Sequence, residues 1–390
     1  MTTPSPALLR FLLLYGAIYA AFGVQSPFLP PLLAHLGLGP ELIGLALGVG
    51  TAARIIAGPV AGRSADARGR PKSVLGLCLV LSALASLGYL WAGGIWAVIL
   101  VSILQSMALA PIAPIADALA LPSAAAARPD GSAPGFPYGW VRGAGSAAFI
   151  IGAIGGGAAV SRLGIPVVVW LNAVLLLAAT ATLAGLPVLR RVPVAQAAPR
   201  GAVRTLLRMP LFRRVTLVAA LVLGSHALHD SFAMIRWAHA GIGAEAAGLL
   251  WAESVAAEVV VFLVIGPPLL NALGPRGAAL LAAAAGAVRW AVSAQTAWLP
   301  AVAMIQPLHG ITFALLHLAC MRLLAEIVPS GMAATALTLY GTVAIGATAA
   351  LLTVASGAIY AHVGAFGFWF MTALCLAAVP VAWGLRASNH

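Results

Sequence analysis

Residues 41–72 read ELIGLALGVGTAARIIAGPVAGRSADARGRPK. The first two thirds of this stretch carry no charge except Glu41 and Arg54, over about the 20 residues that a helix needs to cross a bilayer. The last third is a hydrophilic turn rich in arginine, which is typical of a loop on the cytoplasmic side of a membrane. The stretch therefore predicts a membrane-spanning helix followed by a cytoplasmic loop.

The composition of the whole chain extends this prediction. Of 390 residues, 62% are hydrophobic and only 8% are charged, and the mean hydropathy is +1.04. Soluble domains carry about 25% charged residues, so the composition excludes a soluble enzyme, a secreted disulfide scaffold and a disordered chain. The long apolar runs also argue against an outer-membrane β-barrel. The net charge of +12 lies mostly between apolar runs without interleaved aromatic residues, so we expect no nucleic-acid partner.

Glycine, proline and charged residues divide the chain into twelve apolar segments, and an even number places both termini on the same side. The basic residues of the loops assign that side to the cytoplasm, with only Arg162 in an outer loop. We therefore expect an all-α, multi-pass protein of the bacterial inner (plasma) membrane, with both termini cytoplasmic. The segments are 8–33, 41–61, 73–92, 95–121, 138–160, 166–187, 213–240, 245–270, 276–296, 300–326, 332–360 and 367–386.

A hydrophilic stretch near the middle of the chain separates two halves. We expect an N-terminal six-helix bundle over 1–187, a cytoplasmic linker over 188–212 and a C-terminal six-helix bundle over 213–390. The stretch 188–212 contains proline and several arginines, which is typical of a loop between bundles.

The two halves resemble one another. At one constant offset, Glu41 and Gly44 correspond to Glu245 and Gly248, and the register continues as far as residues 71–72. Short apolar matches arise easily by chance, but one register held over about 30 residues does not. Two parallel six-helix repeats predict a transporter with a central site and alternating access.

Ionisable residues inside apolar segments are costly in a bilayer unless they are paired or hydrated, so each is a candidate functional residue. We expect four of them to couple transport to proton movement: Glu258, Arg289, His309 and His317. We expect eight others to bind substrate: Arg54, Asp117, Arg142, His226, His229, Asp230, Glu253 and Arg322.

Glu258 and Arg289 fall near the middle of successive segments, so they lie at similar depth and can pair. Burial favours the protonated form of a carboxyl group, whereas a nearby arginine favours the ionised form. A glutamate whose arginine neighbour changes with conformation can therefore load and release a proton. We interpret Glu258 as the proton carrier, Arg289 as its modulator, and His309 and His317 as relay or substrate-contact groups. Arg54 is suited to an anionic group of the substrate.

Structural roles remain open for the same residues. Arg142 can pair with Asp117 as a structural bridge on the cytoplasmic side, and Arg322 can pair with Glu326 or reach the cytoplasmic surface. The Glu258–Arg289 pair and the histidines can likewise serve packing alone.

The turn at 62–72 is similar to the Gly-x-x-x-Asp-Arg-x-Gly-Arg-Arg signature of the major facilitator superfamily, with Ala67 in place of one basic residue. From about residue 10 to 385, the chain resembles the bacterial 3-phenylpropionate permease family, a lactose-permease-like branch of that superfamily. The stretches that carry the resemblance include Pro114-x-x-Asp117-Ala118, Tyr138-Gly139-x-Val141-Arg142, Val288-Arg289-Trp290 and Leu308-His309-x-x-Thr312.

This resemblance implies a twelve-helix, proton-coupled importer of aromatic acids or related small molecules. It also implies that Glu258 and Arg289, with His309 or His317, form the coupling group. Four residues of the seventh and eighth segments depart from the apolar or aromatic pattern of the family and indicate a more polar or differently charged substrate: His229, Asp230, Arg236 and Glu253.

Other functions have specific signatures. A proton-coupled efflux antiporter of drugs is the alternative, although segment 138–160 lacks the Gly-Pro pair that resembles the antiporter signature. A receptor would need a soluble signalling domain, for which no loop or tail is long enough. No GxSxG, Walker or HExxH motif occurs, so we expect no enzyme, cofactor or metal. We expect a monomer whose partners are a small-molecule substrate, protons and the lipid bilayer.

Overall fold

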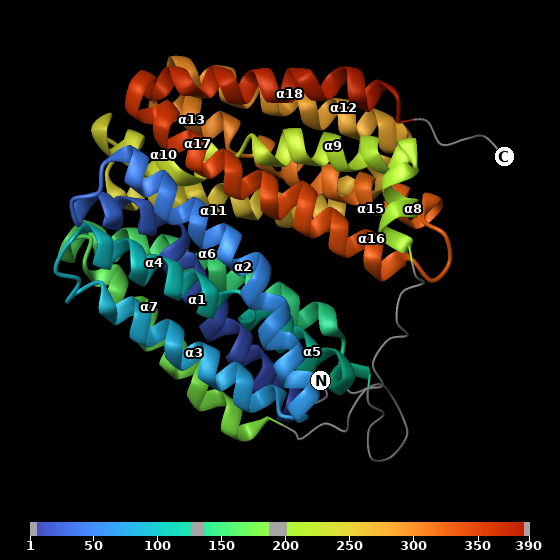
Figure 1. Ribbon diagram of the computed structural model, residues 1–390. Helices are drawn as coiled ribbons and strands as arrows, with labels where there is room; N and C mark the ends of the chain where they lie inside the picture. The colour runs from blue at the N-terminus through green and yellow to red at the C-terminus, as the bar shows by residue number, and fades with distance from the viewer. Residues whose placement is uncertain (1–5, 126–135, 187–200, 386–390) are drawn as a thin grey trace. The chain divides into compact units, whose positions relative to one another are not determined.

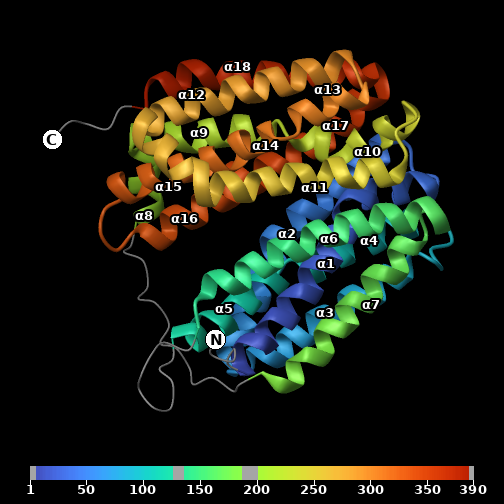
Figure 2. The same cartoon turned by 180° about the vertical axis from the view of Figure 1, so that it is seen from behind.

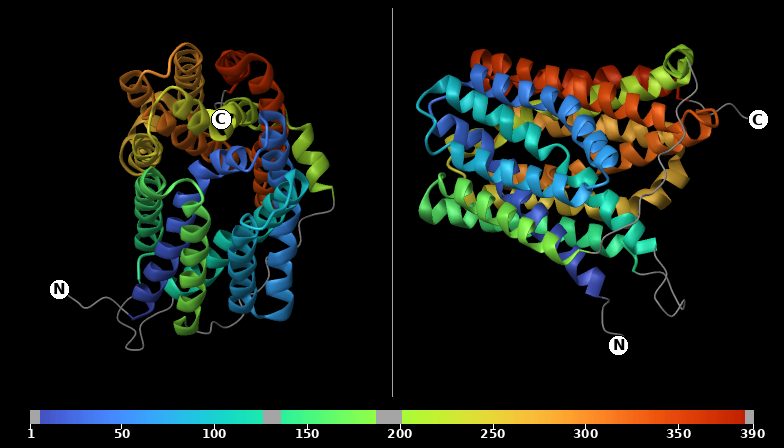
Figure 3. Two further views of the ribbon diagram at one scale, coloured as in Figure 1. Left: turned by 90° about the vertical axis from the view of Figure 1, so that its left-hand side faces the viewer. Right: turned by 60° about the horizontal axis from the view of Figure 1, so that its bottom comes forward.

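The computed structural model describes residues 6–125, 136–186 and 201–385, and these residues form helices joined by short turns (Figure 1). The helices group into two compact units. Unit 1 comprises Met1–Leu38, Ala52–Val194 and Gly243–Ala252. Unit 2 comprises Gly39–Thr51, Ala195–Ile242 and Glu253–His390. Within each unit the long helices run alongside one another, as the right-hand view of Figure 3 shows.

Unit 1 holds the helices of the first half of the chain. They are α1 (Pro6–His35), most of α2 (Pro40–Arg68), α3 (Pro71–Gly88), α4 (Ile95–Leu109), α5 (Ile112–Ala125), α6 (Tyr138–Leu163), α7 (Val167–Thr182) and the short 3-10 turn η1 (Leu183–Gly185).

Helix α1 lies in the core of unit 1, where it packs along α6 and α7. Its buried residues recur every three or four positions, which is the spacing of one helix face. Gly23 of α1 and Gly152 of α6 let the two helices approach closely, because a side chain at either position would overlap the backbone of Phe149 or Ala20. Small residues at helix contacts are a common device of membrane proteins, where apolar side chains face lipid as readily as protein.

Unit 2 holds the remaining helices. They are α8 (Ala202–Arg208), α9 (Pro210–Gly224), α10 (Ala227–His239), the second part of α11 (Ala244–Val260) from Glu253 on, α12 (Gly266–Gln295), α13 (Leu299–Ile305), α14 (Leu308–Gly310), α15 (Leu316–Ile327), α16 (Ala333–Leu339), α17 (Thr348–Val363) and α18 (Phe368–Trp383). Figure 2 shows α11, α12, α14 and α15 from the side on which they are best seen.

Unit 2 departs from regular helix geometry at several places. Three π-helical segments interrupt its spans: η2 (Val261–Ile265), η3 (Ile311–Leu315) and η4 (Tyr340–Ala347). Gly274 has a φ of +66°, a left-handed conformation that glycine adopts without strain, and it divides α12 into two helices. A short 3-10 turn, η5 (Gly364–Gly367), joins α17 to α18. π-Helical segments such as η2, η3 and η4 occur frequently at functional sites.

The expected fold class is confirmed. Among the described residues, ten helical stretches are long and apolar enough to cross a membrane, and two of them, Ala244–Gln295 with 52 residues and Ala333–Trp383 with 51 residues, are long enough to cross it twice. The stretches therefore provide the twelve crossings of the predicted all-α membrane fold. Of the expected linker at 188–212, residues 188–200 lie outside the described residues, and α8 occupies part of the rest.

Candidate functional site

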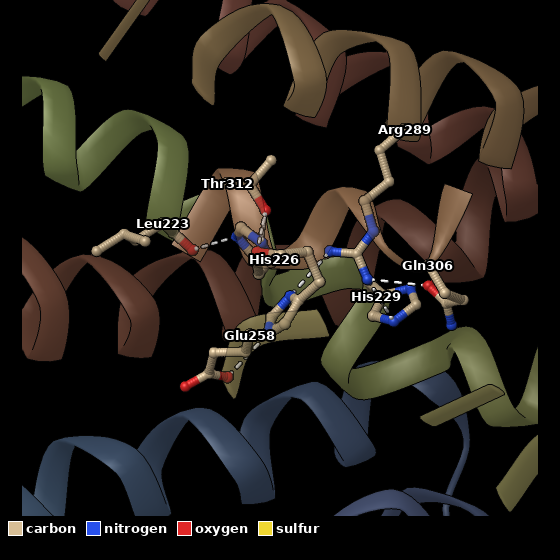
Figure 4. A network of polar contacts seen from close by, with 8 residues as sticks. Leu223, His226, His229, Glu258, Arg289, Gln306 and Thr312 are labelled. Atoms are coloured by element: carbon tan, nitrogen blue, oxygen red, sulfur yellow. Dashed lines mark hydrogen bonds and ion pairs between the residues drawn. The ribbon is translucent and has the colours of Figure 1, made fainter. Parts of the chain in front are cut away.

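A network of polar side chains in unit 2 is centred on Arg289 of α12 (Figure 4). Arg289 is only 1% exposed. Its guanidinium lies 3.1 Å from Nδ1 of His309, 3.0 Å from Oε1 of Gln306 and 3.4 Å from Nε2 of His229. His229 comes from α10, Arg289 from α12, His309 from α14 and Gln306 from the turn between α13 and α14, so the network joins three spans of the unit.

The chemistry of Arg289 determines the proton positions on His309. A guanidinium donates hydrogen bonds and cannot accept them, so Nδ1 of His309 must accept. In the neutral imidazole the proton is therefore on Nε2, which lies 3.4 Å from Oε2 of Glu258. His309 thus stands between the carboxylate of Glu258 and the guanidinium of Arg289, with its N–H directed at the carboxylate. The side chain of Glu258 is 25% exposed.

Close packing brings these two residues together. A Cβ atom at Gly310, next to His309, would lie 2.6 Å from the backbone oxygen of Ala257, next to Glu258. Only glycine allows the two backbones to approach this closely, so the short helix α14 can bring His309 against α11. The π-helical segment η2 directly follows α11, and η3 directly follows α14.

His226 joins the network through Thr312. The break between α9 and α10 places Nδ1 of His226 3.1 Å and 3.2 Å from the carbonyl oxygens of Val222 and Leu223, so Nδ1 carries a proton and donates it. Nε2 lies 3.0 Å from Oγ1 of Thr312, and the same hydroxyl lies 3.1 Å from the carbonyl oxygen of His309. The single hydroxyl proton can serve only one of these two acceptors at a time.

Trp290 packs against one side of the network. The guanidinium of Arg289 lies 4.6 Å from the centroid of the indole ring, a cation–π contact. The indole N–H donates to Oγ of Ser225 at 2.7 Å. Within the described residues, Nε of Arg289 and Nε2 of Gln306 are buried without a hydrogen-bond partner. A buried cation surrounded mainly by neutral acceptors is costly, so its electrostatic balance depends on nearby acids.

A second cluster lies in unit 1, around Asp117 of α5. Oδ1 of Asp117 accepts hydrogen bonds from the hydroxyls of Tyr15 and, at 2.8 Å, of Tyr138, and it lies 3.6 Å from the guanidinium of Arg142. Arg142 also donates to the hydroxyl of Tyr19 and lies 5.3 Å from its ring centroid. The side chain of Arg142 is 46% exposed, so this charged group remains accessible.

The structure therefore assembles part of the predicted set. Five predicted residues meet in the network of unit 2: His226, His229, Glu258, Arg289 and His309. Asp117 and Arg142 meet in unit 1, where they form the ion pair that the sequence left open as a structural alternative. The sequence did not single out the neutral partners Tyr15, Tyr19 and Gln306; for the first two, their spacing of four residues on one helix face was the available signal.

The other predicted residues lie apart from these contacts. Arg54 is exposed and forms no hydrogen bond or ion pair with a described residue. Asp230 is exposed at the start of α10, and its negative charge attracts the guanidinium of Arg289. His317 packs beside Phe262, with ring centroids 5.9 Å apart.

Glu253 is half-buried on α11. Arg322 pairs with Glu326 at 3.2 Å and donates to Asn271 at 2.9 Å, which is the local pairing that its spacing allowed.

Comparison with known proteins identifies relatives of the whole chain. The MFS_1 like family matches residues 8–371. A "Probable 3-phenylpropionic acid transporter" of Escherichia coli (strain K12) is 32% identical over 380 residues, which cover 94% of this chain and 94% of that protein. A maltose permease of Geobacillus stearothermophilus is 27% identical over 350 residues, which cover 89% of this chain and 86% of that protein.

Solved structures share the fold at low sequence identity. The crystal structure of the nucleoside transporter NupG matches with a TM-score of 0.76 and 18% identity, over 97% of both chains. A bacterial homologue of the human lysosomal transporter Spinster matches with a TM-score of 0.75 and 15% identity, over 100% of both chains. These structures show that the fold of this chain is the one that those transporters have.

Proposed function

The chain belongs to the MFS_1 like family and is a secondary transporter of the major facilitator superfamily, and from this premise we propose that it is a proton-coupled symporter that imports a small organic carboxylate. The printed name of the Escherichia coli relative makes aromatic acids the first substrate class to test. We further propose that the protein lies in the bacterial inner membrane with both termini in the cytoplasm, because the basic residues of its loops lie almost entirely on one side of the predicted spans. The proposed working unit is a monomer.

The observation that carries the proton coupling is the position of His309 between Glu258 and Arg289. In this arrangement the negative carboxylate offsets the buried positive guanidinium. A proton on Glu258 removes this negative charge and leaves Asp230 as the acid that acts on Arg289, and Asp230 forms no hydrogen bond to the guanidinium in the described part of the chain. An anionic substrate bound beside the network restores the balance, so the proton and the anion favour each other's binding.

The cluster of unit 1 supports a carboxylate as the substrate group. Arg142 is half exposed and can form two parallel hydrogen bonds with a carboxylate. If Arg142 turns from Asp117 to a substrate, the hydroxyls of Tyr15 and Tyr138 still donate to Asp117. The exchange therefore leaves no acid unpaired, and the stacked rings of Tyr15 and Tyr19 offer an aromatic surface beside the arginine. Arg54 is a second cation suited to the substrate.

The test of coupling is the substitution Glu258→Gln, measured in proteoliposomes with an imposed proton gradient. We expect uphill accumulation of the substrate to be abolished and counterflow exchange to be retained, because exchange needs no net proton movement. Glu245→Gln removes an exposed carboxylate from the same helix and should leave both activities unchanged. Uphill accumulation by the Glu258→Gln protein would show that Glu258 is not the proton carrier.

The exposed carboxylate of Asp230 favours a second candidate, a proton-coupled efflux antiporter of small molecules or drugs. An acid without a hydrogen-bond partner among the described residues of its span is suited to a cationic ligand. Ligands that bind only the folded protein raise its melting temperature. Stabilisation by aromatic carboxylates would support import, whereas stabilisation by lipophilic cations alone would support efflux.

A further inference from the structure

Helix α8 differs from the spans in its direction. In Figures 1 and 2 it lies crosswise to the long helices of unit 2, at the ends of α9 and α16. It packs against these two helices through the buried side chains of Ala202 and Leu206. A helix that lies across the ends of membrane spans is in the region of the lipid headgroups.

The seven residues of α8 present three successive faces. Ala202 and Leu206 form the buried face, and the next face around the helix holds Val203 and Leu207, which are 47% and 48% exposed. The face after that holds Arg204 and Arg208, which are both exposed, and we call these two residues the arginine face. Because residues four apart share a helix face, the order is protein contact, exposed apolar surface and positive charge. This order suits a helix whose apolar surface meets acyl chains and whose charges meet headgroups.

The positive charges around α8 are not balanced by the residues that the structure describes. Residues 201–224 contain four arginines and no acid. Among the described residues, Arg204, Arg208 and Arg213 have no hydrogen-bond or ion-pair partner for their guanidinium groups, whereas Arg214 donates to the carbonyl oxygen of Gly384 at 2.9 Å. Three exposed arginines without a partner in the described part of the chain, beside an exposed apolar face, have the charge and the shape to bind an anionic lipid.

We propose that α8 lies in the membrane interface and that its arginine face, together with Arg213, binds the headgroups of anionic phospholipids. Val203 and Leu207 then cover the adjoining part of the acyl chains. The site is separate from the polar network of Figure 4 and depends neither on the substrate nor on proton coupling.

The test is a titration of the purified full-length protein in detergent with phosphatidylglycerol or with phosphatidylcholine, with bound lipids counted by native mass spectrometry. We expect the wild-type protein to prefer phosphatidylglycerol. Arg204→Gln and Arg208→Gln should each weaken phosphatidylglycerol binding about fivefold, which is the effect of one arginine near an anionic surface. Neither substitution should alter phosphatidylcholine binding or the melting temperature, because both side chains are exposed.

Two further variants separate this site from a general effect of charge. Arg162→Gln also removes one exposed arginine, at the end of α6, and should leave phosphatidylglycerol binding unchanged. The double variant Val203→Ser, Leu207→Ser keeps the charge and should weaken binding of the same lipid through lost acyl contact. Absence of a preference for phosphatidylglycerol in the wild-type protein, or an equal loss in the Arg162→Gln variant, would overturn the proposal.

Discussion

Asp117 depends on neutral donors as well as on Arg142. The hydroxyl of Tyr138 donates to its Oδ1 at 2.8 Å, and the guanidinium of Arg142 lies 3.6 Å from the same oxygen. Removal of the hydroxyl by Tyr138→Phe leaves more of the negative charge to be offset by Arg142. The arginine is then held more tightly by Asp117 and is less available to a substrate carboxylate.

We therefore expect Tyr138→Phe to weaken binding of a carboxylate substrate by about 3- to 10-fold, which corresponds to the loss of one hydrogen bond of about 1 kcal/mol. The measurement is the Kd from isothermal titration calorimetry or from substrate-dependent tryptophan fluorescence. Tyr360→Phe is the matched control, because the ring of Tyr360 stacks on Phe232 in unit 2, away from this cluster. An unchanged Kd for Tyr138→Phe would mean that Asp117 does not compete with the substrate for Arg142.

Charged residues of the candidate site could be predicted from the sequence, and their neutral partners could not. Glu258, Arg289 and Asp117 are conspicuous because a charge inside an apolar segment is rare and costly. Gln306 and Thr312 carry no such signal, because uncharged polar residues are tolerated in spans when they find a hydrogen bond. Which partner each one finds depends on the rotation and depth of neighbouring helices, which a single sequence does not specify.

At the scale of the element, the contact between α14 and α11 determines how near His309 comes to Glu258. The Gly310→Ala substitution would place a Cβ atom 2.6 Å from the backbone oxygen of Ala257, and a helix backbone cannot yield as a side chain can. The helices must then move apart, which lengthens the 3.4 Å separation between His309 and Glu258.

We expect Gly310→Ala to lower proton-driven accumulation by at least tenfold and to reduce the free energy of unfolding by ~1–3 kcal/mol, the usual cost of overpacking. Transport in proteoliposomes and thermal unfolding in detergent measure the two effects. Gly155→Ala adds the same methyl group where nothing lies within 4 Å, so it should leave both unchanged. Wild-type accumulation by the Gly310→Ala protein would show that this close approach is not needed for coupling.

The positions of the membrane spans could be predicted from the apolar segments of the sequence, whereas the π-helical irregularities within the spans could not. The division of the apolar stretch between Ala244 and Gln295 into two crossings agrees with the break at Gly274, because glycine and proline there interrupt the apolar run. The π-helical segments η2 and η3 have no comparable signal in the sequence. Their backbone hydrogen bonds are shifted by one residue, and this shift arises from tertiary packing. Those segments adjoin Glu258 and His309, so the local geometry of the candidate site was the part that sequence could not supply.

At the scale of the whole molecule, the distribution of charge predicts the orientation in the membrane. The turn between α2 and α3 is rich in arginine, as is the segment 201–214 of α8 and the start of α9, and an even number of crossings places these two segments on one side. The opposite side has Arg162 at the end of α6 and the acids Glu41 and Glu245 at the starts of α2 and α11. Retention of basic loops in the cytoplasm explains this asymmetry.

Cysteine labelling tests the orientation directly. The three native cysteines are buried, so they contribute little background. Arg70→Cys and Arg162→Cys each place a thiol at an exposed position, at opposite ends of the spans because three crossings separate them. A membrane-impermeant maleimide added to intact cells should label Arg162→Cys alone, and permeabilised cells should label both. Labelling of Arg70→Cys in intact cells would show that the orientation is the opposite of the predicted one, with α8 at the outer leaflet.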